Sequence, residues 1–165
     1  MSLKEIPLGG LCLSAFLIVR DSSGKVLMGK INTEAPWDHL GALDPARIEL
    51  HRKGWMLPSS HLIVHESPQL ALRRIGVEQL EMPVLSISEP IVISEVYRPR
   101  NFADSDEHWD IEFVSFALEE EDRVPSRTLA FSELRMLDPK MMKRGEIARS
   151  HEDILASAGI ALLDL

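Results

Sequence analysis

The stretch GWMLPSSHLIVHESPQLALRRIGVEQLEM, residues 54–82, decides how this chain folds. Ser67 or Glu66 is suited to cap a helix, and Pro68 fits the first turn of one. The sequence therefore predicts a helix over about residues 67–81. A short strand at residues 55–57 and the turn Pro58-Ser59-Ser60 are expected to lead into it.

Alternating and β-branched runs on both sides of this helix predict a sheet. The expected strands are residues 11–20, 25–31, 84–88, 91–97, 108–118 and 134–138. A short helix is expected after Pro45, and a capping box at Ser150–Asp153 predicts a last helix over about residues 150–159. This order predicts a single domain over residues 1–165 of α/β (α+β) class, in which a mixed β-sheet is packed between helices.

The composition narrows the classes of partner and of site. The 18 basic and 26 acidic residues give a net charge of −8, which disfavours binding to nucleic acid. The net charge does not exclude a small phosphorylated ligand, since a local arginine cluster or a bound metal can outweigh the negative electrostatic field of the whole protein. The single Cys12 excludes an internal disulfide, and no Cys/His spacing typical of a zinc site occurs. The apolar run at residues 8–19 is too short to span a membrane and predicts a buried strand, so a cytoplasmic protein is expected.

The segment Trp55–Met82 resembles the signature of the Nudix (MutT-like) hydrolase superfamily, G-x5-E-x7-R-E-U-x-E-E-x-G-U, where U is a bulky aliphatic residue. The family usually carries W-x-L-P-G before it, and residues 55–58 read Trp-Met-Leu-Pro. Ser60 falls on the signature glycine, Glu66 on the first glutamate and Arg74 on the arginine, with both spacers of the right length. The resemblance implies a Nudix-like sandwich.

The second half of the signature is degenerate. In an ungapped alignment Ile75 replaces a glutamate, Glu78 keeps the next one and Gln79 replaces the last. A gapped alternative places Gly76-Val77 on the closing glycine–aliphatic pair and shortens the helix; the ungapped version keeps Glu78. Positions 75, 78 and 79 share one helix face, so a family member with three glutamates there presents three ligands to Mg²⁺. One carboxylate remains here.

The resemblance also implies roles for individual residues. A depleted site for Mg²⁺ or Mn²⁺ would use Glu66 and Glu78 as ligands, with Glu112 as the base. Arg74 is expected to pair with Glu66 and fix the loop, as it does in the family. Other candidates come from the residues themselves: His61 or His65 as base or phosphate donor, the alternating His108, Asp110 and Glu112 on one strand face, and Arg98 and Arg100 as a phosphate clamp. In all, the catalytic candidates are Glu66, Glu78 and Glu112, and the substrate-binding candidates are Arg74, Arg98, Arg100 and His61.

Two functions remain open. The first is a Nudix-type hydrolase of a nucleoside diphosphate derivative, with weak or altered activity because of the depleted metal site. The alternative is a non-catalytic Nudix fold that senses a nucleotide or binds a protein partner. A homodimeric interaction module without a small ligand is a third interpretation.

Overall fold

The computed structural model describes Pro7, residues 9–97 and residues 107–163. Its six strands are β1 (Leu11–Arg20), β2 (Val26–Ile31), β3 (Ser59–His61), β4 (Ile91–Tyr97), β5 (His108–Leu118) and β6 (Phe131–Leu137). They form one sheet in the order β4-β5-β1-β2-β6, and β3 pairs with β1. The pairing of β1 with β5 is parallel and the other pairings are antiparallel, so the predicted mixed sheet is confirmed.

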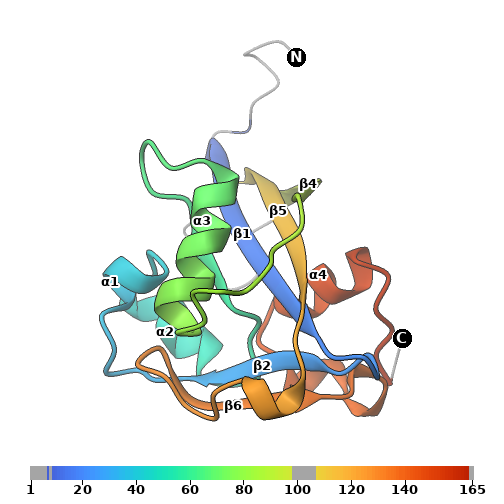
Figure 1. Cartoon of the computed structure of the whole chain (residues 1–165). Helices are drawn as coiled ribbons and strands as arrows, with labels where there is room; N and C mark the ends of the chain where they lie inside the picture. The colour runs from blue at the N-terminus through green and yellow to red at the C-terminus, as the bar shows by residue number, and fades with distance from the viewer. Residues whose placement is uncertain (1–6, 8, 98–106, 164–165) are drawn as a thin grey trace.

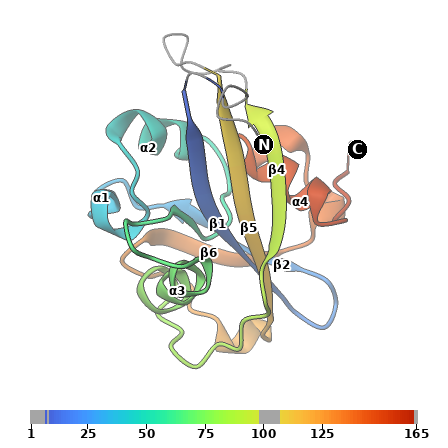
Figure 2. The ribbon, with the colours of Figure 1, turned by 90° about the horizontal axis from the view of Figure 1, so that it is seen from above.

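Four α-helices accompany the sheet: α1 (Trp37–Leu40), α2 (Pro45–His51), α3 (Pro68–Arg74) and α4 (His151–Ser157). Short 3₁₀ turns lie at Glu121–Arg123, Pro139–Met141 and Arg144–Glu146. Figures 1 and 2 show α3 and α4 on opposite sides of the strands β1, β5 and β4. The sheet is therefore covered by helices on both faces. Among the described residues, no helix is long and apolar enough to cross a bilayer.

The two faces of β1 build two apolar cores because side chains alternate along a strand. Ala15, Leu17 and Val19 pack in the core that also holds residues of α3, whereas Phe16 and Ile18 pack in the core that holds residues of α4. All five side chains are buried. The long central strand β1 thus joins both halves of the molecule.

The decisive helix begins as the sequence predicts. Ser67 is the N-cap of α3 and its hydroxyl accepts from the N–H of Leu70, while Pro68 occupies the first turn. After Arg74 the chain continues without a break into a π-helical turn at Ile75–Gln79, whose C-cap Leu80 donates to the carbonyl of Ile75. The helical segment therefore ends close to the predicted position 81.

Three local predictions are wrong. Residues 84–88 form no strand: Leu85 and Ile87 pack on the core, and Ser88 alone in this run donates its N–H to β5, at the carbonyl of Phe116. Residues 55–57 contribute only single bridges, to Ile147 and Gly29, and the strand in this region is β3. Ser150 precedes α4 in a left-handed conformation with φ of 76° and no side-chain cap, so the capping box is absent although the helix is present.

Candidate functional site

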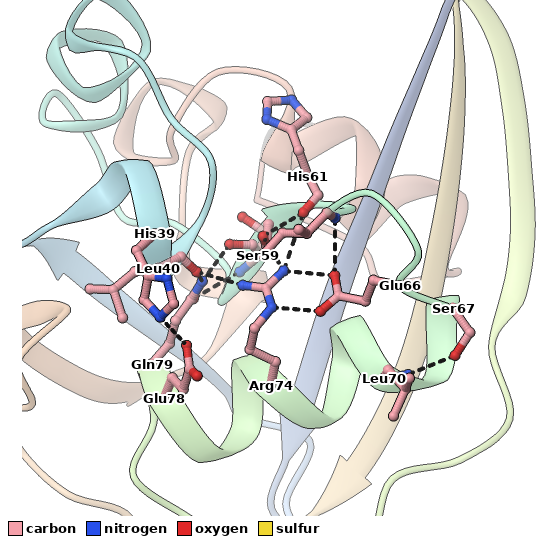
Figure 3. A network of polar contacts seen from close by, with 12 residues as sticks. His39, Leu40, Ser59, His61, Glu66, Ser67, Leu70, Arg74, Glu78 and Gln79 are labelled. Carbon is pink, nitrogen blue, oxygen red and sulfur yellow. Dashed lines mark hydrogen bonds and ion pairs between the residues drawn. The ribbon is translucent and has the colours of Figure 1, made fainter.

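Arg74 anchors the loop before α3. Its guanidinium donates to both carboxylate oxygens of Glu66, at 2.7 and 2.9 Å (Figure 3). It also donates to the hydroxyl of Ser60 and to the carbonyl oxygens of Leu40 and His61. These hydrogen bonds from Arg74 lower the pKa of Glu66. The predicted Glu66–Arg74 pair is confirmed, and its geometry fixes a loop.

Gln79 closes the same loop from the next turn of the helix. Its Nε2 donates to the carbonyl oxygens of Leu40 (2.8 Å) and Ser59 (2.7 Å), and its Oε1 accepts from the N–H of Ser59 (3.2 Å) (Figure 3). The side chain is fully buried. An ionised glutamate could not replace it, because a carboxylate has no hydrogen to donate to two carbonyl oxygens.

The other two positions of this helix face hold no cluster of carboxylates. Ile75 is fully buried in the apolar core. Glu78 is partly exposed, and its Oε2, which is shielded from solvent, lies 3.4 Å from Nε2 of His39. This contact is an ion pair without hydrogen-bond geometry, and it is charged only when His39 is protonated. The face at 75, 78 and 79 therefore carries one carboxylate, as the ungapped alignment predicts.

A pocket of about 450 Å³ lies on the face of β1 and β5 next to α2 and the start of α4. The strands contribute Cys12, Ser14 and Phe16 from β1, and His108, Asp110 and Glu112 from β5. Helix α2 contributes Arg47, Leu50 and His51. The remaining wall includes Leu43, the residues 59–61 of β3 and the residues 149–151. Such a volume lies in the range of small-ligand sites.

The strand register places the polar side chains of this pocket side by side. In the parallel ladder, Cys12 is opposite Asp110 and Ser14 is opposite Glu112. Residues two apart on a strand share a face. The sequence-based expectation that His108, Asp110 and Glu112 share one face is therefore confirmed, and all three line the pocket.

Burial changes the acid–base chemistry of the pocket carboxyls. It raises the pKa of Glu112 to about 8, and the neighbouring charges of Asp110, Glu95 and Asp153 add to the effect. Burial also raises the pKa of Asp110, against the opposing influence of His108. Glu112 therefore holds its proton through most of the neutral range, where it can donate a hydrogen bond.

Two imidazoles link α2 to the start of α4. The N–H of Leu57 donates to Nδ1 of His151 (2.9 Å), so the proton of this neutral ring must lie on Nε2. Nε2 of His151 then donates to Nε2 of His51 at 3.0 Å, and Nδ1 of His51 donates to the carbonyl of Arg47 at 2.6 Å. Burial lowers the pKa of both histidines, which keeps both rings neutral.

The structure divides the predicted site residues into three groups. Glu112 and His61 line the pocket. Glu66, Arg74 and Glu78 belong to the loop anchor and helix, and they are absent from the pocket lining in the described part of the chain. Arg98 and Arg100 lie outside the described residues.

Sequence reasoning missed several pocket residues. These are Cys12, Arg47, His51, Arg149 and His151. They come from three segments of the chain, namely β1, α2 and the start of α4, and no single spacing relates all five. The alternation of the strand at 11–20 could have indicated Cys12, and the i, i+4 spacing of Arg47 and His51 after Pro45 could have placed these two on one helix face.

Comparisons of the sequence with protein-family models and with curated proteins give no match. Solved structures do match. The NUDIX domain of Shewanella oneidensis NrtR in complex with ADP ribose gives a TM-score of 0.55 at 16% identity, over 96% of this chain and 92% of that chain. The Escherichia coli dihydroneopterin triphosphate pyrophosphohydrolase gives 0.54 at 12% identity, over 88% and 95%.

A bifunctional NMN adenylyltransferase/ADP ribose pyrophosphatase from Francisella tularensis gives a TM-score of 0.54 at 12% identity, over 93% of this chain and 42% of that chain. At these identities the likeness concerns the fold. It confirms the Nudix-like sandwich that the resemblance at residues 55–82 implies.

Proposed function

Given that the chain has the Nudix fold, we propose that it binds a small phosphorylated ligand of the nucleoside diphosphate class in the pocket on β1 and β5. In this proposal the helical segment at residues 68–79 has a structural role and binds no metal. The observation that supports this role is that Gln79 is buried and hydrogen-bonded to Leu40 and Ser59. Its amide occupies the helix face on which the family signature places metal-binding glutamates.

The residues of this helix do not fit the divalent metal that the fold implies. Mg²⁺ requires near-octahedral oxygen coordination and usually binds one or two carboxylates. Ile75 offers no ligand, and the carbonyl of Gln79 already accepts from Ser59. Both oxygens of Glu66 accept from Arg74. Glu78 alone remains, and its Oε2 is shielded from solvent beside His39, so this helix offers too few oxygen ligands for near-octahedral coordination.

The pocket offers the complementary chemistry for a nucleotide-type ligand. Arg47 and Arg149 are cationic groups suited to phosphate oxygens, and Phe16 provides an apolar surface. Asp110 is an acceptor suited to ribose hydroxyls. His61 donates from Nδ1 to the carbonyl of Ala42, so its Nε2 can meet a ligand. The Shewanella neighbour was crystallised with ADP ribose, which makes this compound the first probe.

Slow hydrolysis in the same pocket is a second candidate function. The observation that favours it is Glu112, a buried carboxyl with a pKa raised to about 8. A base with a pKa near the working pH is well matched to taking a proton from water that attacks phosphorus. The expected catalytic and metal-binding roles of Glu66 and Glu78 stay predictions apart from this candidate, because neither residue lines the pocket.

One set of incubations separates the two functions. Purified protein is mixed with ADP ribose and other nucleoside diphosphate derivatives, with and without Mg²⁺ or Mn²⁺, and both binding and products are measured. The binding proposal predicts saturable binding without product, weakened in Arg149→Ala and unchanged in Glu78→Gln. Product formation lost in Glu112→Gln supports the second candidate. Metal-dependent turnover lost in Glu78→Gln would overturn the structural role of the helix, and an absence of binding would overturn the choice of ligand.

A further inference from the structure

Three side chains with different metal-binding chemistry meet where β1 and β5 begin. A ligand atom of each of Cys12, His108 and Asp110 lies within 4.8 Å of the other two. The parallel register places Cys12 opposite Asp110, and His108 precedes Asp110 by two residues on the same face. The backbone of this corner is fixed, because the N–H of Trp109 donates to the carbonyl of Gly10.

The separation of these atoms suits a single ion. Ligand atoms about 2.0–2.3 Å from a tetrahedral zinc ion lie roughly 3.3–3.8 Å apart. Nε2 of His108 lies 3.2 Å from Oδ1 of Asp110, and both side chains are largely buried, at 18% and 15% exposure. Cys12 is half-buried and its thiol forms a hydrogen bond with Asp110. The three side chains are therefore already turned toward one another before any ion binds.

The donor set selects the kind of ion. A thiolate and an imidazole favour zinc and similar borderline transition metals, whereas Mg²⁺ favours oxygen ligands alone. Binding replaces the thiol proton of Cys12 with the metal, so one proton is released for each ion bound. One thiolate and one carboxylate then balance the two positive charges of the ion. The resulting site is electrically neutral, which suits a largely buried position.

We propose that Cys12, His108 and Asp110 form a three-ligand site for a divalent transition-metal ion, with zinc the expected occupant. Because the three residues line the pocket, the fourth coordination position faces the pocket and is open to water or a ligand oxygen. The site lies on the strands and not on the helix at residues 68–79. It stands whether or not the pocket binds a nucleotide.

A second group of potential ligands shares one residue with this site. Glu95, Asp110 and Glu112 also bring carboxylate oxygens within 4.8 Å of one another. Glu95 is exposed, and acidic groups at a surface commonly gather without an ion. Cys12 and His108 distinguish the proposed site from this carboxylate group. Metal binding at the proposed site must therefore require these two residues.

Cobalt(II) provides a direct test, because a thiolate bound to Co²⁺ gives a charge-transfer absorption that oxygen ligands do not give. The full chain is stripped with a chelator and titrated with Co²⁺, and Zn²⁺ is then added as a competitor. The proposal predicts one Co²⁺ for each chain, a thiolate charge-transfer band, and displacement by Zn²⁺ but not by excess Mg²⁺.

Variants assign the ligands. Cys12→Ser should abolish the charge-transfer band, and His108→Ala and Asp110→Asn should each weaken Co²⁺ binding by about 100-fold or more, since even the loss of an outer-shell partner costs about 10- to 100-fold. His39→Ala, which removes an exposed histidine elsewhere, and Glu95→Gln should keep the wild-type spectrum. A circular dichroism melting curve of each variant shows that it is folded.

Several results would overturn the proposal. They are the absence of saturable Co²⁺ binding, a spectrum without a thiolate band, or a Cys12→Ser spectrum identical to that of the wild type. Loss of binding in Glu95→Gln with retention in His108→Ala would assign the ion to the carboxylate group instead.

Discussion

The side-chain amide of Gln79 forms hydrogen bonds with both backbone polar groups of Ser59, accepting from its N–H at 3.2 Å and donating to its carbonyl oxygen at 2.7 Å. This relationship ties the helix at 68–79 to the start of β3, one wall of the pocket. Together with the Glu66–Arg74 pair, it gives the helix a structural task that needs no metal ion.

Replacing Gln79 should destabilise the protein. Gln79→Ala removes this partner from the N–H and the carbonyl oxygen of Ser59, and each unpaired buried group costs about 1–3 kcal/mol. The carbonyl oxygen of Leu40 keeps Arg74 as a donor. We expect a loss of about 3 kcal/mol in the free energy of unfolding, measured by urea denaturation. The exposed Gln69→Ala on the same helix is the control and should change it by less than about 0.5 kcal/mol.

Gln79→Glu should make stability fall as the pH rises. A buried glutamate there faces two carbonyl oxygens, so its folded pKa lies above the unfolded value of about 4.3. The protonated form can donate one hydrogen bond, and the ionised form can donate none. Urea midpoints at pH 5 and pH 8 should therefore differ more from wild type at pH 8. An equal difference at both pH values would contradict the amide's role as donor.

Arg74→Ala should lower the free energy of unfolding more than Arg73→Ala on the same helix does. The Arg74–Glu66 pair is largely buried, and loss of one partner of a buried pair costs about 3–5 kcal/mol. Arg74→Lys should rescue only part of this, because an ammonium cannot reproduce the two-pronged contact with Glu66. Arg73→Ala, at an exposed position, is the matched control in thermal denaturation. Similar losses for Arg73→Ala and Arg74→Ala would contradict the loop-anchor role.

The two linked histidines should make stability fall in mild acid. Burial depresses the pKa of His51 and His151 in the folded state, so the unfolded chain takes up protons first as the pH drops below about 6.5. Each histidine then costs up to about 1.4 kcal/mol for each pH unit until its folded pKa is reached. Glu112, whose folded pKa is raised, has the opposite slope, so the histidine effect is isolated by comparing variants.

His51→Leu should therefore gain stability relative to wild type between pH 6.5 and pH 5.5, and the exposed His39→Ala should not. The free energy of unfolding at each pH gives both differences. A pH-independent difference for His51→Leu would show that His51 takes up its proton equally readily in the folded and unfolded protein, against the lowered pKa that burial causes.

Gly54 should tolerate no side chain. A Cβ there would lie 2.6 Å from backbone atoms of Ile147 and Ala148, the segment that leads to α4 and one wall of the pocket. Gly54→Ala should lower the free energy of unfolding by about 1–3 kcal/mol through the forced backbone shift. At Gly145 a Cβ meets nothing within 4 Å, so Gly145→Ala is the control for the loss of glycine itself. A neutral Gly54→Ala would contradict this close approach.

Features that depend on residues close in the chain could be predicted from the sequence. The family resemblance at residues 55–82 predicted the Glu66–Arg74 ion pair, and alternation predicted the common face of His108, Asp110 and Glu112. Both depend on residues close in the chain or on one strand. The run at 84–88 shows the limit, since its alternation reflects packing of Leu85 and Ile87 on the core and not a ladder.

The partners of Gln79 and Cys12 could not be predicted, because each depends on a distant segment. Gln79 meets Leu40 across a long loop, and a glutamine in a helix gives no sign of such a contact. Cys12 meets Asp110 only through the parallel register of β1 and β5. Neither contact has a spacing signature, so the proposed transition-metal site could not be predicted from the sequence alone.

Calorimetric titration of the wild-type protein with ADP ribose, first in a chelator and then in excess Mg²⁺, tests the claim that the pocket binds a ligand while the helix at 68–79 holds no metal. If the pocket binds the ligand and the helix at 68–79 holds no metal, the dissociation constants should agree within about threefold, which is less than about 0.7 kcal/mol, and the ligand should be recovered intact. Binding that requires Mg²⁺ and is followed by cleavage of the diphosphate would contradict the claim.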